Sequence, residues 1–233
     1  MSERPLVTVV GATGHQGGSA VLSLVDTGNS VKAQNLKRSC NNDGTDIELV
    51  NCDIINKDDL LHAFKNSWAS YSVTDYWAQP NKPEIEMQQG KLMVDVAAEL
   101  NIPYYISTCV VNINALSDNK LDVPHFTQKA LIRDYIVEKY PQLKTIFVLP
   151  GCVQNWLKLQ LEKMNDGTVV FRAPLDQKAK LHLVDIDDTG PIVVEMLKNP
   201  DQYIGPDICI CGEEIAFEDV PKVFQKVTGI KPN

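Results

Sequence analysis

Residues 7–19 read VTVVGATGHQGGS, and this stretch decides the fold. A short apolar run breaks into clustered glycines, after which apolar residues resume at helical spacing. The pattern predicts a strand, a tight glycine turn and the start of a helix. Such a unit presents backbone N–H groups and the positive end of a helix dipole to an anionic ligand, most often the pyrophosphate of a dinucleotide. The stretch therefore predicts a nucleotide-binding site near the N-terminus.

Strand-like and helix-like segments alternate along the chain as far as Pro150. Parallel strands joined by helical crossovers form a doubly wound sheet, whose ligand crevice lies beyond the carboxyl ends of the strands. We therefore expect an α/β fold with a Rossmann-type doubly wound parallel sheet. The expected strands are 6–10, 30–35, 47–51, 71–73, 104–108 and 144–149, and the expected helices are 17–25, 56–64, 85–100 and 126–139.

The alternation loosens beyond Pro150. Residues 164–168 read MNDGT, which favours a hairpin turn, and an apolar strand is expected at 181–184. Asp187 and Asp188 are expected to cap a helix that reaches Leu197. We expect residues 1–154 to form an NAD(P)-binding Rossmann domain and residues 155–233 a smaller C-terminal α/β lobe.

Composition and charge exclude several classes of protein. The chain has 233 residues and a formal net charge of -8 without a run of lysine or arginine, which excludes direct nucleic-acid binding. The sequence shows no apolar stretch long enough for a membrane span and no signal-peptide pattern. Its six cysteines lack C-x-x-C spacing and its four histidines lack metal-ligand spacing. We expect free thiols, no metal site and a cytoplasmic or nuclear location.

The glycine turn supplies the first part of a cofactor site. Its G-x-x-G-x-x-G spacing is the form seen in short-chain and extended dehydrogenases. The alternative is a glycine turn that serves only strand-to-helix packing. The residues expected to face the phosphates are Gly11, Thr13, Gly14, His15, Gln16 and Gly17.

The end of the second expected strand bears on the choice of dinucleotide, and residues 34–38 read QNLKR. An acidic residue there accepts hydrogen bonds from the ribose 2′-OH, whereas basic residues accommodate a 2′-phosphate. Lys37 and Arg38 therefore favour NADP(H) over NAD(H). Asn35 could still serve a 2′-OH, and the two cations could instead belong to a solvated loop.

Later strand ends supply the rest of the expected site. A carboxylate after the third strand, Asp53, can meet the adenine amino group, or it can merely cap a turn. The backbone after the fourth strand would pass the nicotinamide ribose. The further residues expected to bind the cofactor are Ile54, Val73, Thr74, Asp75, Ser107, Thr108, Lys129, Pro150 and Cys152.

Several short motifs, in their order and spacing, resemble the NmrA-like family of atypical short-chain dehydrogenases. They cover almost the whole chain and comprise residues 11–19, 31–34, 74–77, 89–92, 125–129, 149–151 with Asn155, 166–168 and 188–191. The resemblance implies an NAD(P)-binding Rossmann domain, a small C-terminal lobe and a regulatory role. Founding members engage a GATA-type transcription factor in nitrogen-metabolite repression or sense the NADPH/NADP balance. Family members typically continue past the position of Asn233, so we expect a shortened lobe.

The proton-transfer motif of this superfamily is displaced in the sequence. Short-chain dehydrogenases use the tyrosine of Tyr-x-x-x-Lys, whose lysine lowers the phenol pKa. Residues 125–129 read HFTQK, so His125 stands where the tyrosine is expected. The literal motif occurs at Tyr135 and Lys139, but helical periodicity places Tyr135 in an apolar stripe, which indicates a core residue. Lys129 is expected to hydrogen-bond the nicotinamide ribose, with a surface lysine as the alternative.

Two functional hypotheses follow. The leading one is a dinucleotide-binding, redox-sensing regulator that couples cofactor state to a protein partner such as a transcription factor. The alternative is an NADPH-dependent reductase of a small carbonyl or enone/quinone compound, in which Lys129 and His125 are the catalytic candidates. Tyr76 and Trp77 either line a substrate pocket or cover the cofactor.

Overall fold

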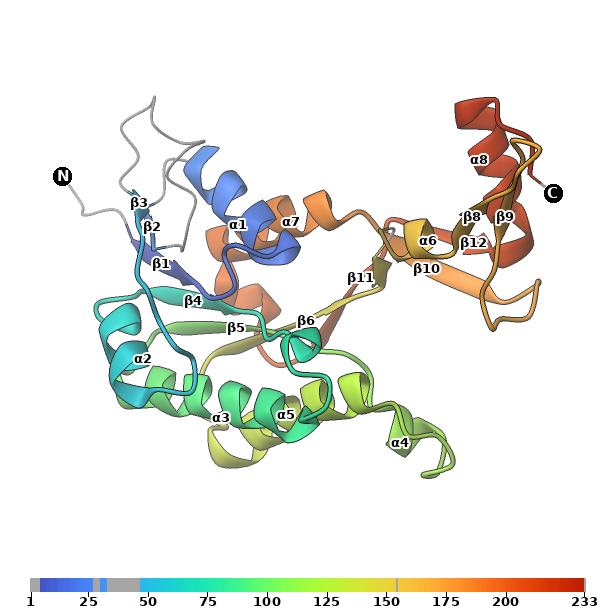
Figure 1. Cartoon of the computed structure of the whole chain (residues 1–233). Coiled ribbons are helices and arrows are strands. Elements are labelled where there is room, and N and C mark those ends of the chain that lie inside the picture. The colour runs from blue at the N-terminus through green and yellow to red at the C-terminus, as the bar shows by residue number, and fades with distance from the viewer. Residues whose placement is uncertain (1–4, 27–29, 33–46, 154, 233) are drawn as a thin grey trace. The chain divides into compact units, whose positions relative to one another are not determined.

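The computed structural model describes residues 5–26, 30–32, 47–153 and 155–232 (Figure 1). The chain divides into two structural units. Unit 1 comprises residues Met1–Leu149 and Asp187–Ile208, and unit 2 comprises Pro150–Ile186 and Cys209–Asn233. Of the helices that the structure describes, none has the length and apolar character needed to cross a membrane.

Unit 1 is built on a seven-stranded sheet with the order β11-β6-β5-β4-β1-β2-β3. β1 pairs in parallel with both β2 and β4, and the pairs β2–β3, β4–β5 and β5–β6 are also parallel. This is the strand order of a Rossmann fold, so the expected fold class is confirmed. The strands are β1 (Leu6–Val9), β2 (Ser30–Lys32), β3 (Ile47–Glu48), β4 (Ala69–Ser72), β5 (Tyr104–Thr108), β6 (Thr145–Pro150) and β11 (Asp207–Ile210). The last residue of β6 and the last two of β11 already belong to unit 2.

Helices cover both faces of this sheet, with α1 and α7 on one side and α2, α3 and α5 on the other (Figure 1). A continuous apolar core, including Phe64, Met93 and Ile136, fills the space under the second group. The bounds in this unit are α1 (His15–Asp26), α2 (Lys57–Phe64), η1 (Tyr76–Ala78), α3 (Pro83–Glu99), α4 (Ile113–Leu116), α5 (Pro124–Lys139), α7 (Thr189–Lys198) and η3 (Pro200–Tyr203).

A close approach of two helices holds α7 in unit 1. A Cβ atom at Gly190 would stand 2.1 Å from the carbonyl oxygen of Ser19 on α1, so only glycine fits there. The Ser19 hydroxyl accepts from the Gly190 N–H at 2.9 Å and donates to the Asp187 carbonyl at 2.8 Å. Residues 187–208, expected in the small lobe, therefore return to the Rossmann unit.

Unit 2 contains a three-stranded sheet with the order β12-β10-β7 and a separate hairpin of β8 and β9. β10 runs parallel to β7 and antiparallel to β12. Asp166 accepts from the Thr168 N–H at 2.9 Å in the hairpin turn, and Gly167 has a φ of 84°, so the expected turn is confirmed. The elements are β7 (Cys152–Val153), α6 (Asn155–Leu159), β8 (Leu161–Lys163), β9 (Val169–Phe171), β10 (Lys180–Val184), β12 (Glu213–Ala216), η4 (Phe217–Asp219) and α8 (Val220–Thr228), with η2 (Ile186–Asp188) at the edge of the unit.

Several local features differ from the expectations, among them the strand expected at 47–51, which ends at Glu48. β4 begins at Ala69 rather than at residue 71, because the small polar Ser70 and Ser72 are buried in it and give no apolar signal. The short helix α4 was not expected, and the Asn112 side chain caps it by accepting from the Ala115 N–H at 3.1 Å. α7 begins after Asp188 as expected, but the Asp188 side chain makes no capping hydrogen bond.

Candidate functional site

The end of β1 and the start of α1 form the glycine turn. Gly11 has a φ of 73°, and a Cβ atom at Gly17 would stand 2.2 Å from the carbonyl oxygen of Gly11. The Gly14 N–H donates to that same oxygen at 2.9 Å. These close approaches bring the first turn of α1 against the strand end. The first N–H groups of a helix lack intrahelical acceptors, so an anion can bind here.

A pocket of about 210 Å³ opens beside this turn. It is mainly apolar, which suits a planar ring such as a purine. The Cys52 thiol lines it in its neutral form, because burial, followed by the nearby Asp59 and Asp53 carboxylates, raises its pKa to about 11. The lining residues are Thr8, Val9, Val10, Gly11, Val50, Cys52, Ile54, Ala63, Val73, Asp75, Ala78 and Gln89.

Asp53 stabilises the turn that precedes α2. Its Oδ1 atom accepts from the Ile55 N–H at 3.1 Å, and its own N–H donates to Asp59 Oδ2 at 2.9 Å. The turn-capping alternative is therefore realised in the structure. Contact between Asp53 and an adenine amino group stays a prediction.

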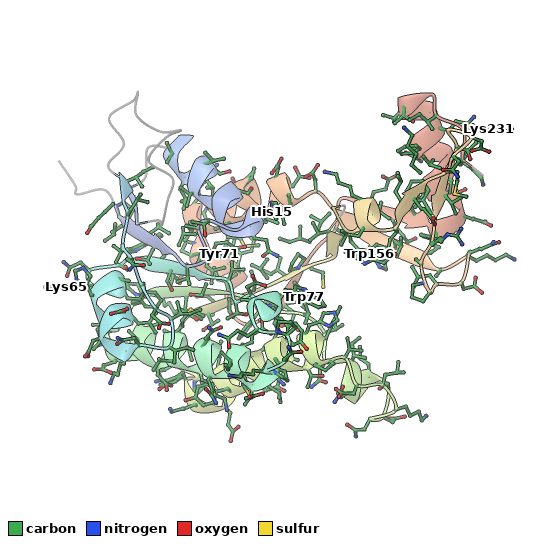
Figure 2. All side chains as sticks on the ribbon, in the orientation of Figure 1. His15, Lys65, Tyr71, Trp77, Trp156 and Lys231 are labelled. Carbon is green, nitrogen blue, oxygen red and sulfur yellow. The ribbon has the colours of Figure 1, made fainter. Side chains whose placement is uncertain are left out.

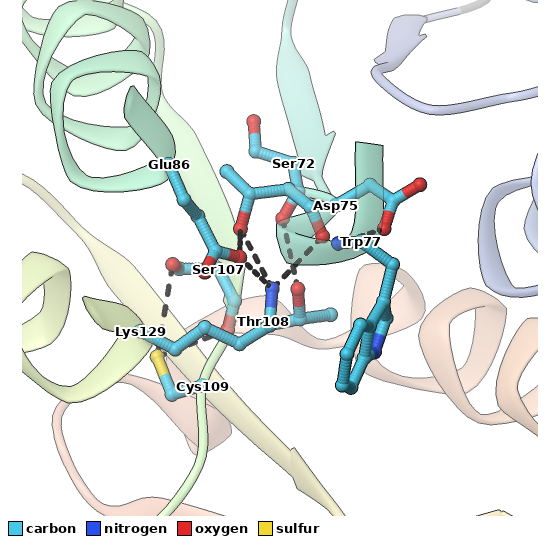
Figure 3. Close-up of polar contacts among 9 residues, drawn as sticks. Ser72, Asp75, Trp77, Glu86, Ser107, Thr108, Cys109 and Lys129 are labelled. Atoms are coloured by element: carbon cyan, nitrogen blue, oxygen red, sulfur yellow. Dashed lines mark hydrogen bonds and ion pairs between the residues drawn. The ribbon is translucent and has the colours of Figure 1, made fainter. Parts of the chain in front are cut away.

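Lys129 lies near the start of α5 and forms a compact polar cluster (Figure 3). Its ammonium donates to the Thr74 carbonyl at 2.8 Å, to Thr74 Oγ1 at 2.7 Å and to Glu86 Oε1 at 2.5 Å. An ammonium has three N–H donors, so all of them are engaged. Only 18% of the Lys129 side chain is exposed, which rules out the solvated surface lysine considered from the sequence.

Glu86 is a residue of this site that no sequence motif indicated. Its side chain is 2% exposed, and Oε1 also accepts from Thr74 Oγ1 at 2.7 Å. Within the described part of the chain, Oε2 has no hydrogen-bond partner. Glu86 shares the helical phase of Gly90, Met93 and Ala97, which are also buried on α3. A carboxylate in the phase of a buried stripe is the signal that could have identified it.

His125 lies one helical turn before Lys129 among aromatic rings. Its ring centroid is 5.6 Å from that of Tyr76, 5.3 Å from that of Trp77 and 4.9 Å from that of Phe126. Burial lowers the pKa of His125; the Glu86 carboxylate opposes this and the Lys129 ammonium adds to it. The imidazole is therefore neutral at pH 7. Trp77, seen in Figure 2, is 66% exposed beside it.

The end of β5 is buried and hydrogen-bonded within the protein. The Thr108 hydroxyl donates to the Ser72 carbonyl at 3.3 Å, and the Cys109 thiol lies 3.7 Å from Ser107 Oγ. Burial raises the pKa of Cys109 to about 11, although its hydrogen bond to Ser107 opposes this. The thiol is neutral and is a poor nucleophile.

Comparison with known proteins adds the family to this geometry. Residues 3–232 match the family model described as the NmrA-like family. The chain belongs to the NmrA-like family. It is 26% identical to an NmrA-like family domain-containing protein of Dictyostelium discoideum over 97% of the chain and 78% of that protein. It is 27% identical to the NmrA-like family domain-containing oxidoreductase FrzB of Cladobotryum sp over 97% of the chain and 74% of that protein.

Solved structures of the negative transcriptional regulator Nmra share the fold. The complex with NAD has a TM-score of 0.86 and 22% identity, over 100% of this chain and 74% of that one. The complex with NADP has a TM-score of 0.83 and 21% identity, over 99% of this chain and 74% of that one. These likenesses support the doubly wound fold found in this family member.

The structure brings together only part of the expected cofactor set. Gly11 of the glycine turn, Ile54, Val73 and Asp75 line the pocket, and the Asp75 side chain accepts from the Trp77 N–H at 2.9 Å. Pro150 and Cys152 belong to unit 2, and their part in the site stays a prediction. Asn35, Lys37 and Arg38 lie outside the described residues.

The literal Tyr-x-x-x-Lys motif of this NmrA-like chain lies elsewhere on α5. The Tyr135 hydroxyl donates to Asp95 Oδ1 at 2.7 Å, and the Lys139 ammonium donates to the Tyr135 oxygen at 2.5 Å. The Tyr135 ring packs against the core as expected, whereas its hydroxyl reaches a surface ion pair. At 1.5 Å per residue, Lys139 lies about 15 Å along the helix axis from Lys129.

The described residues contain no group of three or more His, Cys, Asp or Glu side chains placed to hold a metal ion.

Proposed function

We propose that this NmrA-like protein binds a nicotinamide dinucleotide in unit 1 and acts as a dinucleotide-responsive regulator of a protein partner. The glycine turn would hold the pyrophosphate, and the apolar pocket beside it would take the adenine ring. Lys129 of α5, whose ammonium lies against Thr74 after β4, would meet the nicotinamide ribose by exchanging one of its two Thr74 contacts for a ribose hydroxyl. The Nmra structures determined with NAD and with NADP support binding of this class of ligand.

The Lys129 cluster is the observation that favours a regulator over an enzyme. Carbonyl reduction needs a group that gives up a proton near neutral pH. The Lys129 donors are all engaged by Glu86 and Thr74, and His125, which replaces the tyrosine, is neutral. Such a site favours holding a dinucleotide over turning it over.

A regulator of this kind works through differential affinity. A dinucleotide shifts a protein between two states only by as much as its binding free energy differs between them. We place the protein in the cytoplasm or nucleus, where a transcription factor is the partner class favoured by the family. Lys37 and Arg38 favour NADP(H) over NAD(H).

Calorimetric titration with NAD⁺, NADH, NADP⁺ and NADPH tests this proposal. We expect the phosphorylated pair to bind more tightly, and the oxidised and reduced forms to differ by about fivefold or more. Four indistinguishable affinities would exclude a sensor. The absence of binding by all four would exclude the dinucleotide site as well.

A second candidate is an NADPH-dependent reductase, which the names of relatives such as the FrzB oxidoreductase favour. A bound reduced nicotinamide supplies a hydride, and Lys129 or His125 would donate the proton to the substrate oxygen. NADPH consumption over a panel of quinones and enones tests it. A rate that is lost in Lys129→Ala and retained in Tyr135→Phe would favour the reductase over the regulator.

A further inference from the structure

We propose that Glu86 is a positioning residue for dinucleotide recognition, which it serves by fixing the Lys129 ammonium at the carboxyl end of β4. The inference rests on the proposed dinucleotide binding and assigns to α3 a role in it. Glu86 acts through Lys129 and needs no contact with the ligand itself.

Three separate elements meet at the Lys129 ammonium (Figure 3). Lys129 comes from α5, Glu86 from α3 and Thr74 from the segment after β4. Thr74 Oγ1 donates to the same Glu86 oxygen that receives the ammonium, at 2.7 Å, so the three groups form a closed triangle. Because α3 and α5 pack on the same core, the triangle ties the ammonium to the rigid part of unit 1.

A lysine needs such a restraint if it is to recognise a ribose. Its charge sits at the end of a flexible four-carbon stem, and the ordering of that stem costs entropy. Thr74 alone offers two neutral oxygens. Glu86 adds a charge-assisted hydrogen bond, which is stronger and fixes the direction of the stem.

Burial of the Glu86 carboxylate costs free energy, which calls for a functional explanation. Its side chain is 2% exposed, and within the described chain Oε2 lacks a hydrogen-bond partner. Apolar side chains of similar volume are commonly as stable or more stable in place of a buried ion pair. The neighbours of Glu86 in the buried phase of α3, such as Gly90 and Met93, are small or apolar. The carboxylate is therefore best explained by the lysine that it holds.

Titration of variants with two ligands tests the role of Glu86. NADP⁺ carries the nicotinamide riboside and a 2′-phosphate, and ADP, which lacks both, reports the part of the site that binds adenosine and diphosphate. We expect Glu86→Gln to weaken NADP⁺ binding by about tenfold while ADP binding stays within about twofold of wild type. Glu84→Gln, on the exposed side of the same helix, is the matched control and should leave both affinities unchanged.

A double-mutant cycle shows whether Glu86 acts through Lys129. We expect Glu86→Gln to cause no further loss of NADP⁺ affinity in the Lys129→Met background. An undiminished loss there would overturn the proposal, as would an equal loss of NADP⁺ and ADP affinity in Glu86→Gln alone, which would indicate a structural role.

A second variant covers the case in which Glu86→Gln does not fold. Glu86→Asp keeps the carboxylate but withdraws it by one methylene, so NADP⁺ affinity should fall and ADP affinity should hold. Unchanged NADP⁺ affinity in this variant overturns the inference alone. A wild-type protein that binds neither NADP⁺ nor NAD⁺ overturns the proposed function together with the inference.

Discussion

Helix α5 carries two lysines that have contrasting surroundings. Near the start of the helix, Lys129 is 18% exposed and pairs with Glu86, which is 2% exposed. Near its end, Lys139 is 49% exposed and pairs with Asp95 at 3.1 Å beside Tyr135. The buried cluster lacks a tyrosine, and the surface cluster has one at the literal motif spacing.

The difference shows that place on the sheet matters more than motif spacing. α5 leads from the carboxyl end of β5 back to the amino end of β6, as crossover helices do in parallel sheets. Lys129 therefore lies at the carboxyl edge of the sheet, where ligands of doubly wound folds bind. Lys139 lies near the opposite edge, where its ion pair with Asp95 links α5 to α3.

The largest expected difference between the two clusters is in the stability lost when the lysine of each is removed. Lys129→Met leaves the Glu86 carboxylate buried without its cation, so we expect the free energy of unfolding to fall by about 2 to 4 kcal/mol. Lys139→Met removes one partner of an exposed pair and should leave the unfolding midpoint close to wild type. Urea denaturation at pH 7 measures both. Equal destabilisation by the two variants would contradict the contrast.

The same contrast predicts a rescue. Addition of Glu86→Gln to Lys129→Met removes the second buried charge, so part of the lost stability should return. A double variant less stable than Lys129→Met would show that the carboxylate supports the fold by itself.

Transfer of the tyrosine to the buried cluster should have the next largest effect. Residue 125 lies four positions before Lys129 and on the same helix face, so a phenol there would have a cation nearby to lower its pKa. We expect His125→Tyr to raise NADPH consumption with a quinone by about tenfold or more over wild type. Tyr135→Phe is the control and should leave the rate unchanged. A rate unaffected by His125→Tyr would count against the placement of the nicotinamide at Lys129.

Trp77 should report ligand binding at the Lys129 cluster alone. It is 66% exposed and its ring lies 5.3 Å from that of His125, whereas Trp68 packs against Tyr104 at 5.1 Å. We expect NADP⁺ to quench tryptophan fluorescence and Trp77→Phe to abolish most of the quench. Trp68→Phe replaces a ring outside the cluster and should retain the quench. Quenching that survives Trp77→Phe would place the ligand elsewhere.

The sequence predicts that Lys129 lies at the carboxyl edge of the sheet, but it does not predict that Glu86 is its partner. The glycine turn and the alternation of strands determine the order of the sheet, and helix α5 must begin at its carboxyl edge. Lys129 could therefore be placed by counting elements. Glu84 and Glu86 look alike in the sequence, and only the helical phase shared with Gly90 and Met93 separates the exposed carboxylate from the buried one.

Local signals failed where small polar residues are buried. Ser70 is fully buried in β4. Close packing of Gly190 against Ser19 places α7 in unit 1. Both depend on contacts between residues far apart in the chain, which no local pattern encodes. Tyr135 is a similar case. Helical periodicity predicts that its ring packs against the core, but it does not predict the hydrogen bond from its hydroxyl to Asp95.

The smallest expected effect is the pH dependence of the surface cluster. Burial raises the pKa of Asp95, but hydrogen bonds from Tyr135, Tyr140 and Lys139 outweigh it and lower the pKa below the ordinary aspartate value of 3.8. A carboxyl group whose pKa is depressed by folding stabilises the fold above its unfolded pKa, and this contribution is lost as the pH falls through the folded pKa. The stability difference between wild type and Asp95→Asn should therefore shrink below about pH 4.

Solvent screening keeps this difference small, because the Asp95 side chain is 33% exposed and its lysine is more exposed still. Urea denaturation of wild type and Asp95→Asn from neutral pH into the acid range measures it, with Glu138→Gln on the exposed side of α5 as the control. A difference that stays constant across that range would show that the hydrogen bonds of Asp95 do not depend on its charge. The surface cluster would then owe its order to the packing of Tyr135 and Tyr140, and its ion pair would contribute nothing measurable to the fold.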